Sequence, residues 1–186
     1  MGAIVLHSGV SLDGFFEGVD ADISWHRVDA ELHQYMNDVL RPAGAFLEGR
    51  VTYQLMEDYW PNADADPDST PVEAEFASVW RDVPKVVYSR TLESVGPNAT
   101  LVRDVVPEEV RALAARSDGD LVVGGAVLGG RFLELGLVDE MRIYVHPVVV
   151  GAGRRLFTDG TPFLDLELRE SRVFGNGVVL LHYARG

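Results

Sequence analysis

The chain has 186 residues, of which 47% are hydrophobic, so it is long enough and apolar enough for one domain with a sizeable core. Its formal net charge of -13 repels phosphate backbones and anionic membranes, so we expect neither nucleic acid nor membrane as a partner. It contains no cysteine, which excludes disulfides, thiolate nucleophiles and cysteine-based metal sites, and we expect no metal. A secretion signal and a long apolar run are both absent from the sequence, which favours a cytoplasmic location.

The first two-thirds of the chain alternate short apolar segments with helical patterns. We expect strands at residues 4–10, 43–47, 85–88, 100–102 and 120–123, and helices at 29–40, 72–80, from 107 onward, and at 126–135. The C-terminal part is strand-rich, with strands at 141–149, 164–173 and 178–183, the last two joined by the hairpin signal Asn176-Gly177. This order predicts a single α/β domain over residues 1–186. Its mixed, mostly parallel sheet has helices on both faces and an antiparallel C-terminal hairpin.

The strongest local signal for a ligand is the turn at Gly124-Gly125. There an apolar strand runs into two glycines and a helix starts at once. Free N–H groups at a helix start favour a phosphate, and glycine lets the ligand approach the main chain. The alternative is a tight turn that serves only close packing. The G-x-G-x-x-G spacing is absent, so the segment is not a Rossmann fingerprint.

Two further turns have similar chemistry. Gly49, Arg50 and Thr52 follow the second expected strand, and Ser89 and Arg90 follow the third. Each also has a plainer interpretation, as a helix start with a solvated arginine or as a polar loop. However, all three turns lie at the carboxyl ends of expected parallel strands, where open α/β sheets bind ligands. Together they indicate an extended dinucleotide better than a single phosphate.

The ordered motifs extend this pattern over nearly the whole chain. They are Ser11-Leu12-Asp13-Gly14-Phe15, Gly49-Arg50-Val51-Thr52-Tyr53, Val87-Tyr88-Ser89-Arg90-Thr91-Leu92, Val123-Gly124-Gly125-Ala126 and Gly136-Leu137-Val138-Asp139-Glu140. In this order the sequence resembles the C-terminal reductase domain of the bifunctional riboflavin-biosynthesis deaminase-reductase (the RibD C-terminal domain). The resemblance implies a dihydrofolate reductase-like fold, NADPH as cofactor and a homodimer. The zinc signature of the deaminase half is absent, so we expect a stand-alone reductase.

The resemblance also implies roles for individual positions. Gly49, Arg50 and Thr52 would meet the cofactor phosphates, and Ser89 and Arg90 would lie near the adenosine 2′-phosphate. Gly124, Gly125, Ala126, Val127 and Leu128 would hold the pyrophosphate and flank the nicotinamide. Asp13 and Gly14 would lie near the nicotinamide and the substrate.

The proton donor is not identified by the sequence, and Asp13 and His26 are weak candidates. Asp13 could instead be a turn residue and His26 a solvated loop histidine. Trp25 could stack on a flat substrate. Glu48 is an unexpected acid at a strand end that faces either substrate or water, whereas His7 and His146 fit core or edge positions in strands.

The likeness to true dihydrofolate reductase is weaker, because Asp29 and Glu31 flank the position of its pterin-binding acid and Ala30 occupies it. We expect the loops at 14–27 and 61–71 to frame the substrate.

The expected function is therefore reduction of a small pyrimidine-, pterin- or carbonyl-type substrate by hydride transfer from NADPH to a C=O or C=N group. The activity would be like that of 5-amino-6-ribosylaminouracil-phosphate reductase or dihydrofolate reductase. The alternative is a non-catalytic nucleotide-binding or regulatory module on the same fold.

Overall fold

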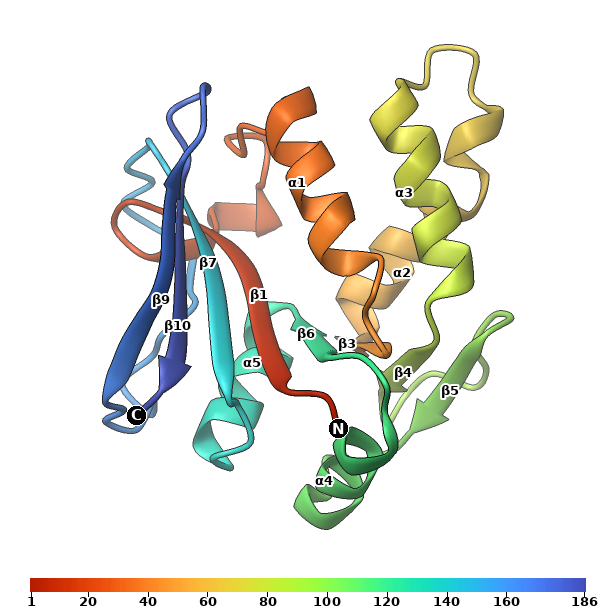
Figure 1. Ribbon diagram of the computed structural model, residues 1–186, viewed down its shortest axis with the longest axis vertical. Helices are drawn as coiled ribbons and strands as arrows, with labels where there is room; N and C mark the ends of the chain where they lie inside the picture. Colours follow the sequence, from red (N-terminus) through yellow and green to blue (C-terminus); the bar gives the residue numbers. More distant parts are fainter.

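The computed structural model describes residues 1–186, built around one eight-stranded sheet with the order β5-β4-β3-β6-β1-β7-β10-β9 (Figure 1). Its parallel strands are β1 (Ile4–Ser11), β3 (Ala45–Gly49), β4 (Lys85–Tyr88), β5 (Ala99–Val102), β6 (Leu121–Gly124) and β7 (Glu140–His146). Strand β10 (Val179–Arg185) runs antiparallel to both β7 and β9 (Leu166–Val173). The α/β class, the mostly parallel sheet and the C-terminal hairpin are thus confirmed.

Helices cover both faces of the sheet. The five α-helices are α1 (Ala30–Leu40), α2 (Arg50–Tyr59), α3 (Pro71–Asp82), α4 (Pro107–Arg116) and α5 (Ala126–Glu134). Two short 3-10 helices are η1 (Val19–Ala21), before α1, and η2 (Trp60–Ala65), after α2. Strand β2 (Phe15–Glu17) pairs with β8 (Arg154–Arg155) in a small second sheet. Figure 1 shows α1, α2 and α3 grouped together, away from α4 and α5. None of the helices is long and apolar enough to cross a bilayer.

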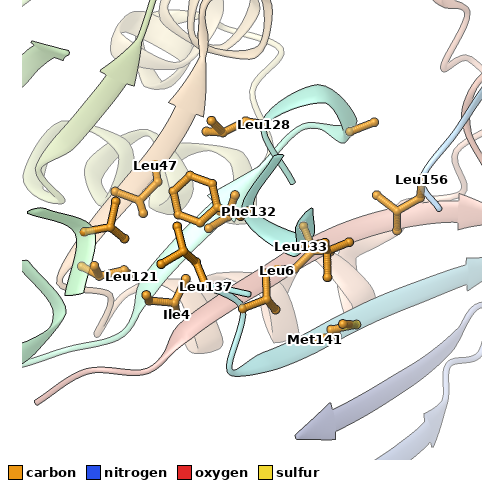
Figure 2. Packing of buried hydrophobic residues seen from close by; sticks show 14 of the residues in the cluster. Ile4, Leu6, Leu47, Leu121, Leu128, Phe132, Leu133, Leu137, Met141 and Leu156 are labelled. Carbon is orange, nitrogen blue, oxygen red and sulfur yellow. The ribbon is translucent and has the colours of Figure 1, made fainter. Parts of the chain in front are cut away.

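The alternation of side chains along β1 divides the molecule into two layers. Ile4 and Leu6 point into the main core against Phe132 of α5, as Figure 2 shows. His7 and Gly9, which occupy the alternate positions, line a cavity on the other face. Residues along the neighbouring strands β3 and β6 alternate between the same two faces. One face of the sheet is therefore filled by the main core, and the other face borders the cavity.

Most strand boundaries lie within one or two residues of the sequence-based expectation, and two of the differences have a clear physical reason. The strand expected at 43–47 begins at Ala45 and runs to Gly49, because its register is set by parallel pairing of Ala45 with Leu121. The strand expected at 141–149 ends at His146. Pro147 follows it, and a proline has no N–H group to donate to a sheet ladder. The first shift matters for function, because it places Glu48 inside a central strand.

Candidate functional site

A cavity of about 500 Å³ lies between the sheet and the helices α1, α2 and α3. His7, Gly9, Glu48 and Gly124 belong to the strands and form its floor. The walls come from the helices, from β2 and from the segment after it, and they include Phe16, His26, Met36, Met56, Trp60, Phe76 and Trp80. No lysine or arginine lines this cavity, and its two carboxyl groups are those of Glu48 and Glu73. It is therefore an apolar, aromatic space with a few buried polar groups on its floor, as is typical of small-molecule sites.

The floor is organised by the register of three parallel strands. Glu48 of β3 lies opposite Gly124 of β6. On the other side of β6, Leu6 of β1 lies opposite Val123, so His7 follows beside Gly124. Glu48 and His7 consequently flank a glycine that has no side chain. This row leaves an opening above Gly124 with a titratable group on either side.

The Glu48 side chain is only 5% exposed, and its Oε2 atom has no hydrogen-bond partner. Burial raises the pKa of the Glu48 carboxyl to about 8; Lys85 opposes this rise, and Glu57 adds to it. The Nζ atom of Lys85 donates to the carbonyl of Trp80 and is not hydrogen-bonded to Glu48. At neutral pH the carboxyl is therefore largely protonated and can donate a hydrogen bond.

Three histidines border the floor as neutral imidazoles. Burial lowers the pKa of His7 to about 3 and that of His146 to about 4, and it also lowers the pKa of His26. The rings of His26 and His146 stack with centroids 4.6 Å apart, and Nδ1 of His146 accepts a bond from the Arg27 amide at 3.0 Å. Nδ1 of His7 and Nε2 of His26 are buried without partners. No group of three or more His, Cys, Asp or Glu residues is placed to hold a metal ion.

The helices α2 and α5 begin beside this floor with free N–H groups. Their N-caps are Gly49 and Gly125, neither helix start has a side-chain cap, and neither has an acidic residue in its first turn. By contrast, Asp29 caps α1 and Thr70 caps α3. Uncapped helix starts are ready-made anion sites.

The two helix starts adjoin at Gly125. This residue has φ +84°, and a Cβ atom placed there would lie 2.5 Å from Oγ1 of Thr52. Gly49, Thr52, Gly124 and Gly125 are thus brought together by β3 and β6, and Thr52, Gly124 and Gly125 line the cavity itself. This cradle, which any side chain at Gly125 would fill, fits a phosphate group of a dinucleotide.

The other expected cofactor positions lie farther out. Arg50 is exposed and donates to Gln54. The Ser89 hydroxyl accepts bonds from the amides of Thr91 and Leu92, so it shapes its own loop. Arg90 pairs with Asp104 at 2.5 Å on the surface.

The side chains at the start of α5 differ in how far they are buried. Ala126 and Leu128 are buried in the main core, whereas Val127 is 70% exposed. Contacts of Ala126 and Leu128 with a cofactor would thus come from the main chain.

The Asp13 carboxylate is held in hydrogen bonds outside the cavity lining. It accepts bonds from the Ser11 hydroxyl at 2.7 Å and from the amides of Val150 and Gly151 at 3.0 and 2.8 Å. The hydrogen bond from Ser11, followed by that from Val150, lowers the pKa of Asp13 to about 2. Asp13 therefore ties two loops together as a carboxylate and does not line the cavity.

Gly14 and Trp25 also lie outside the cavity lining. Gly14 has φ +84° and forms the turn after β1, a conformation that favours glycine. The Trp25 ring packs edge-on against His26 and His146, and its Nε1 donates to the Asp22 carbonyl at 2.9 Å. Trp25 therefore packs against the two histidines and does not line the cavity. Of the two expected proton-donor candidates, Asp13 and His26, it is His26 that lines the cavity.

Several lining residues were not predicted. The acidic loop at 61–71 contributes nothing to the lining, and α3 closes the cavity instead with Phe76 and Trp80. His7 was expected in the core or at an edge, but it faces the cavity. A sequence signal existed for His7 and Glu48, since each is a titratable residue that interrupts an apolar strand. Trp60 and Trp80 are residues that can stack on a flat substrate, but aromatic residues at such positions more often pack in a core or interface, so the sequence favours only Trp25.

Comparison with known proteins places the chain in a family. The profile of the RibD C-terminal domain matches residues 3–180. The uncharacterized protein YyaP of Bacillus subtilis (strain 168) is 35% identical over 181 residues, which cover 97% of this chain and 93% of that protein. The chain therefore belongs to the RibD C-terminal domain family.

Solved structures agree with this fold. A putative riboflavin biosynthesis protein from Shewanella sp. PV-4 superposes with a TM-score of 0.74 at 22% identity, covering 99% of each chain. Dihydrofolate reductase from Enterococcus faecalis, complexed with NADP(H) and RAB-propyl, has a TM-score of 0.64 at 14% identity and covers 100% of this chain and 97% of its own. The dihydrofolate reductase-like fold expected from the sequence is thereby confirmed.

Proposed function

We propose that the protein is an NADPH-dependent reductase of a small molecule. The observation that carries the proposal is that the cavity floor at Gly124 continues into the uncapped starts of α2 and α5. A dinucleotide needs a place for its phosphates beside a space in which the nicotinamide meets a substrate. In this chain the two places share Thr52, Gly124 and Gly125.

When bound, NADPH would supply a hydride, and the protein would supply position and a proton. The residues that fit the cofactor are Gly49, Thr52 and Gly125 for the phosphates, with Arg50, Ser89 and Arg90 along the adjoining edge. Membership of the RibD C-terminal domain family supports this assignment. The complex of Enterococcus faecalis dihydrofolate reductase with NADP(H) supports it further, because that protein shares the fold.

The test is a fluorescence titration of the protein with NADPH, with NADH as the comparison. The variant Gly125→Val should lose binding, because a side chain at φ +84° is strained and meets the Thr52 hydroxyl. The matched control is Gly130→Ala in the same helix, where a Cβ atom meets nothing within 4 Å. Circular dichroism and Tm of both variants separate lost binding from lost folding.

Absence of NADPH and NADH binding by the folded wild type would refute the proposal. Binding without oxidation of NADPH across pterin, pyrimidine and carbonyl substrates would favour a non-catalytic nucleotide-binding module instead. We further expect a homodimer in the cytoplasm. The open edge of β9 supports the dimer, because Leu168 and Val173 are 55% and 73% exposed there. Sedimentation equilibrium measures the oligomeric state directly.

A further inference from the structure

The floor of the cavity also carries information about the substrate, and the inference drawn from it rests on the proposed function. We propose that Glu48 is the proton donor of the reaction, and that the substrate is an uncharged, flat heterocycle bound over Gly124 without a phosphate or carboxylate group in the cavity.

The shape of the floor favours a ring. Glu48 and His7 lie on the two strands that flank β6, so about two strand spacings, roughly 10 Å, separate their main chains. Between them Gly124 has no side chain. The walls are largely aromatic and thioether groups, including Met36, Met56, Trp60 and Phe76. A planar, mainly apolar molecule that presents polar atoms at its edges matches this space.

Apart from the uncapped starts of α2 and α5, which are assigned above to the cofactor, the lining has no group that pairs with an anion. No arginine or lysine lines the cavity, and its two carboxyl groups are those of Glu48 and Glu73. The four lining histidines cannot replace a cation at neutral pH, because burial lowers the pKa of His7, His26, His33 and His146. A phosphate of the substrate, bound away from those helix starts, would lose its hydration without gaining a counterion. The expected ribosylaminouracil phosphate therefore does not suit this site.

The protein leaves one carboxyl oxygen of Glu48 unused. The groups that face it are Lys85 on β4 and both Glu57 and Tyr53 on α2. Each has another partner: Lys85 donates to the Trp80 carbonyl, Glu57 accepts from Trp80 Nε1 at 3.0 Å, and the Tyr53 hydroxyl accepts from the Gly96 amide at 2.9 Å. Oε2 of Glu48 thus finds no partner within the protein. Buried polar groups are almost always satisfied, so this carboxyl group, whose Oε1 lies beside Gly124, is suited to a ligand.

Bound NADPH would supply a hydride to the carbon of a C=N or C=O bond, and the π electrons of that bond would move to the nitrogen or oxygen. That atom takes the proton of the protonated Glu48 carboxyl, which leaves a carboxylate. Solvent returns a proton to Glu48 after the product leaves. His7, on the other side of Gly124, holds the opposite edge of the ring through its unpartnered Nδ1.

The first experiment measures binding without cofactor, by the shift in Tm with a matched pair of probes. 6-Methylpterin is uncharged, and pterin-6-carboxylate is the same ring with an anionic group. 6-Methylpterin should raise the Tm of the wild type. Pterin-6-carboxylate should need a concentration at least about tenfold higher to produce the same rise. Failure to bind 6-methylpterin, or equal or tighter binding of the carboxylate, would overturn the substrate class.

The second experiment separates proton donation from binding. Glu48→Gln keeps a hydrogen-bond donor of the same shape but has no acidic proton. We expect 6-methylpterin affinity to stay within about tenfold. Turnover of 7,8-dihydro-6-methylpterin with NADPH should fall by about a hundredfold or more. The control is Glu108→Gln, an exposed residue of α4 outside the cavity lining, which should leave both unchanged.

The pH profile gives an independent reading. Wild-type kcat/KM should decline as Glu48 ionises, and the profile of Glu48→Gln should lack that decline. Undiminished turnover by Glu48→Gln would refute the role of Glu48 while NADPH binding, measured separately, still supports a reductase. If NADPH fails to bind but 6-methylpterin still binds more tightly than pterin-6-carboxylate, the reductase proposal fails and the substrate site stands.

Discussion

Glu48 and Gly124 lie side by side in the parallel pair β3–β6, and Oε1 of Glu48 is 3.8 Å from the point that a Cβ atom on Gly124 would occupy. This spacing is an ordinary van der Waals contact. The glycine is therefore not required by packing against its neighbours. It is required if the space above it is used by a ligand.

Gly124→Ala tests that relationship. The added methyl group would also meet Cγ2 of Thr52 at 3.8 Å, so the variant should fold with a Tm close to that of the wild type. Its methyl group nevertheless projects into the cavity floor, and we expect affinity for 6-methylpterin to fall by about tenfold. Thermal denaturation with and without the probe measures both quantities. A variant that binds the probe as tightly as the wild type would show that the ligand does not lie over Gly124.

The pH dependence of stability tests the buried state of Glu48. Its pKa is raised from 4.5 to about 8 in the folded protein, so the folded state holds a proton that the unfolded state has lost. Stability should therefore decline with rising pH between these values and level off above about 8. The histidines act in the opposite sense and at lower pH, because their folded pKa values lie below 6.5. Their effect is a loss of stability as pH falls below 6.5.

Between pH 6.5 and about 8 the difference in stability between the wild type and Glu48→Gln isolates Glu48, because the buried histidines contribute equally to both proteins. Across this window the free energy of unfolding of the wild type should decrease by on the order of 2 kcal/mol relative to that of Glu48→Gln. Urea denaturation of both proteins at the two ends of the window measures this difference. If the variant and the wild type lose stability equally, Glu48 is not protonated in the folded protein.

The order of strands and helices was predictable because it depends on local periodicity. The site was predictable only where a turn has an unusual composition, as at Gly124-Gly125. Glu48 was seen as an unexpected acid, but its direction depends on the register between β3 and β6, which no local pattern contains. Asp13 is the opposite case, because the sequence suggests a site residue and the structure shows a structural role. It belongs to a family motif near the expected site, but its carboxylate accepts long-range hydrogen bonds from the amides of Val150 and Gly151.

The pair Arg90–Asp104 tests the preference for NADPH over NADH. Arg90 follows β4, is 75% exposed and pairs with Asp104 at 2.5 Å. If it binds the 2′-phosphate, Arg90→Ala should weaken NADPH binding by about tenfold and leave NADH binding within about twofold. Asp104→Asn frees the guanidinium from its partner and should tighten NADPH binding. Fluorescence titrations of both variants with both cofactors measure these ratios, and an unchanged ratio would assign the preference to other residues.

Asp13→Asn tests whether the motif aspartate is structural or catalytic. The amide has one oxygen in place of a carboxylate that accepts three hydrogen bonds, so the loop around Val150 should be held less firmly and Tm should fall. The lowered pKa of Asp13 means that its contribution in the wild type is present at neutral pH and is lost only as pH falls toward about 2. The Tm deficit of the variant should accordingly shrink in acid. Turnover of 7,8-dihydro-6-methylpterin, measured well below Tm, should remain within about threefold, far from the hundredfold loss expected when a general acid is removed. A loss of that size in a folded variant, with a wild-type pH profile of stability, would return the catalytic role to Asp13.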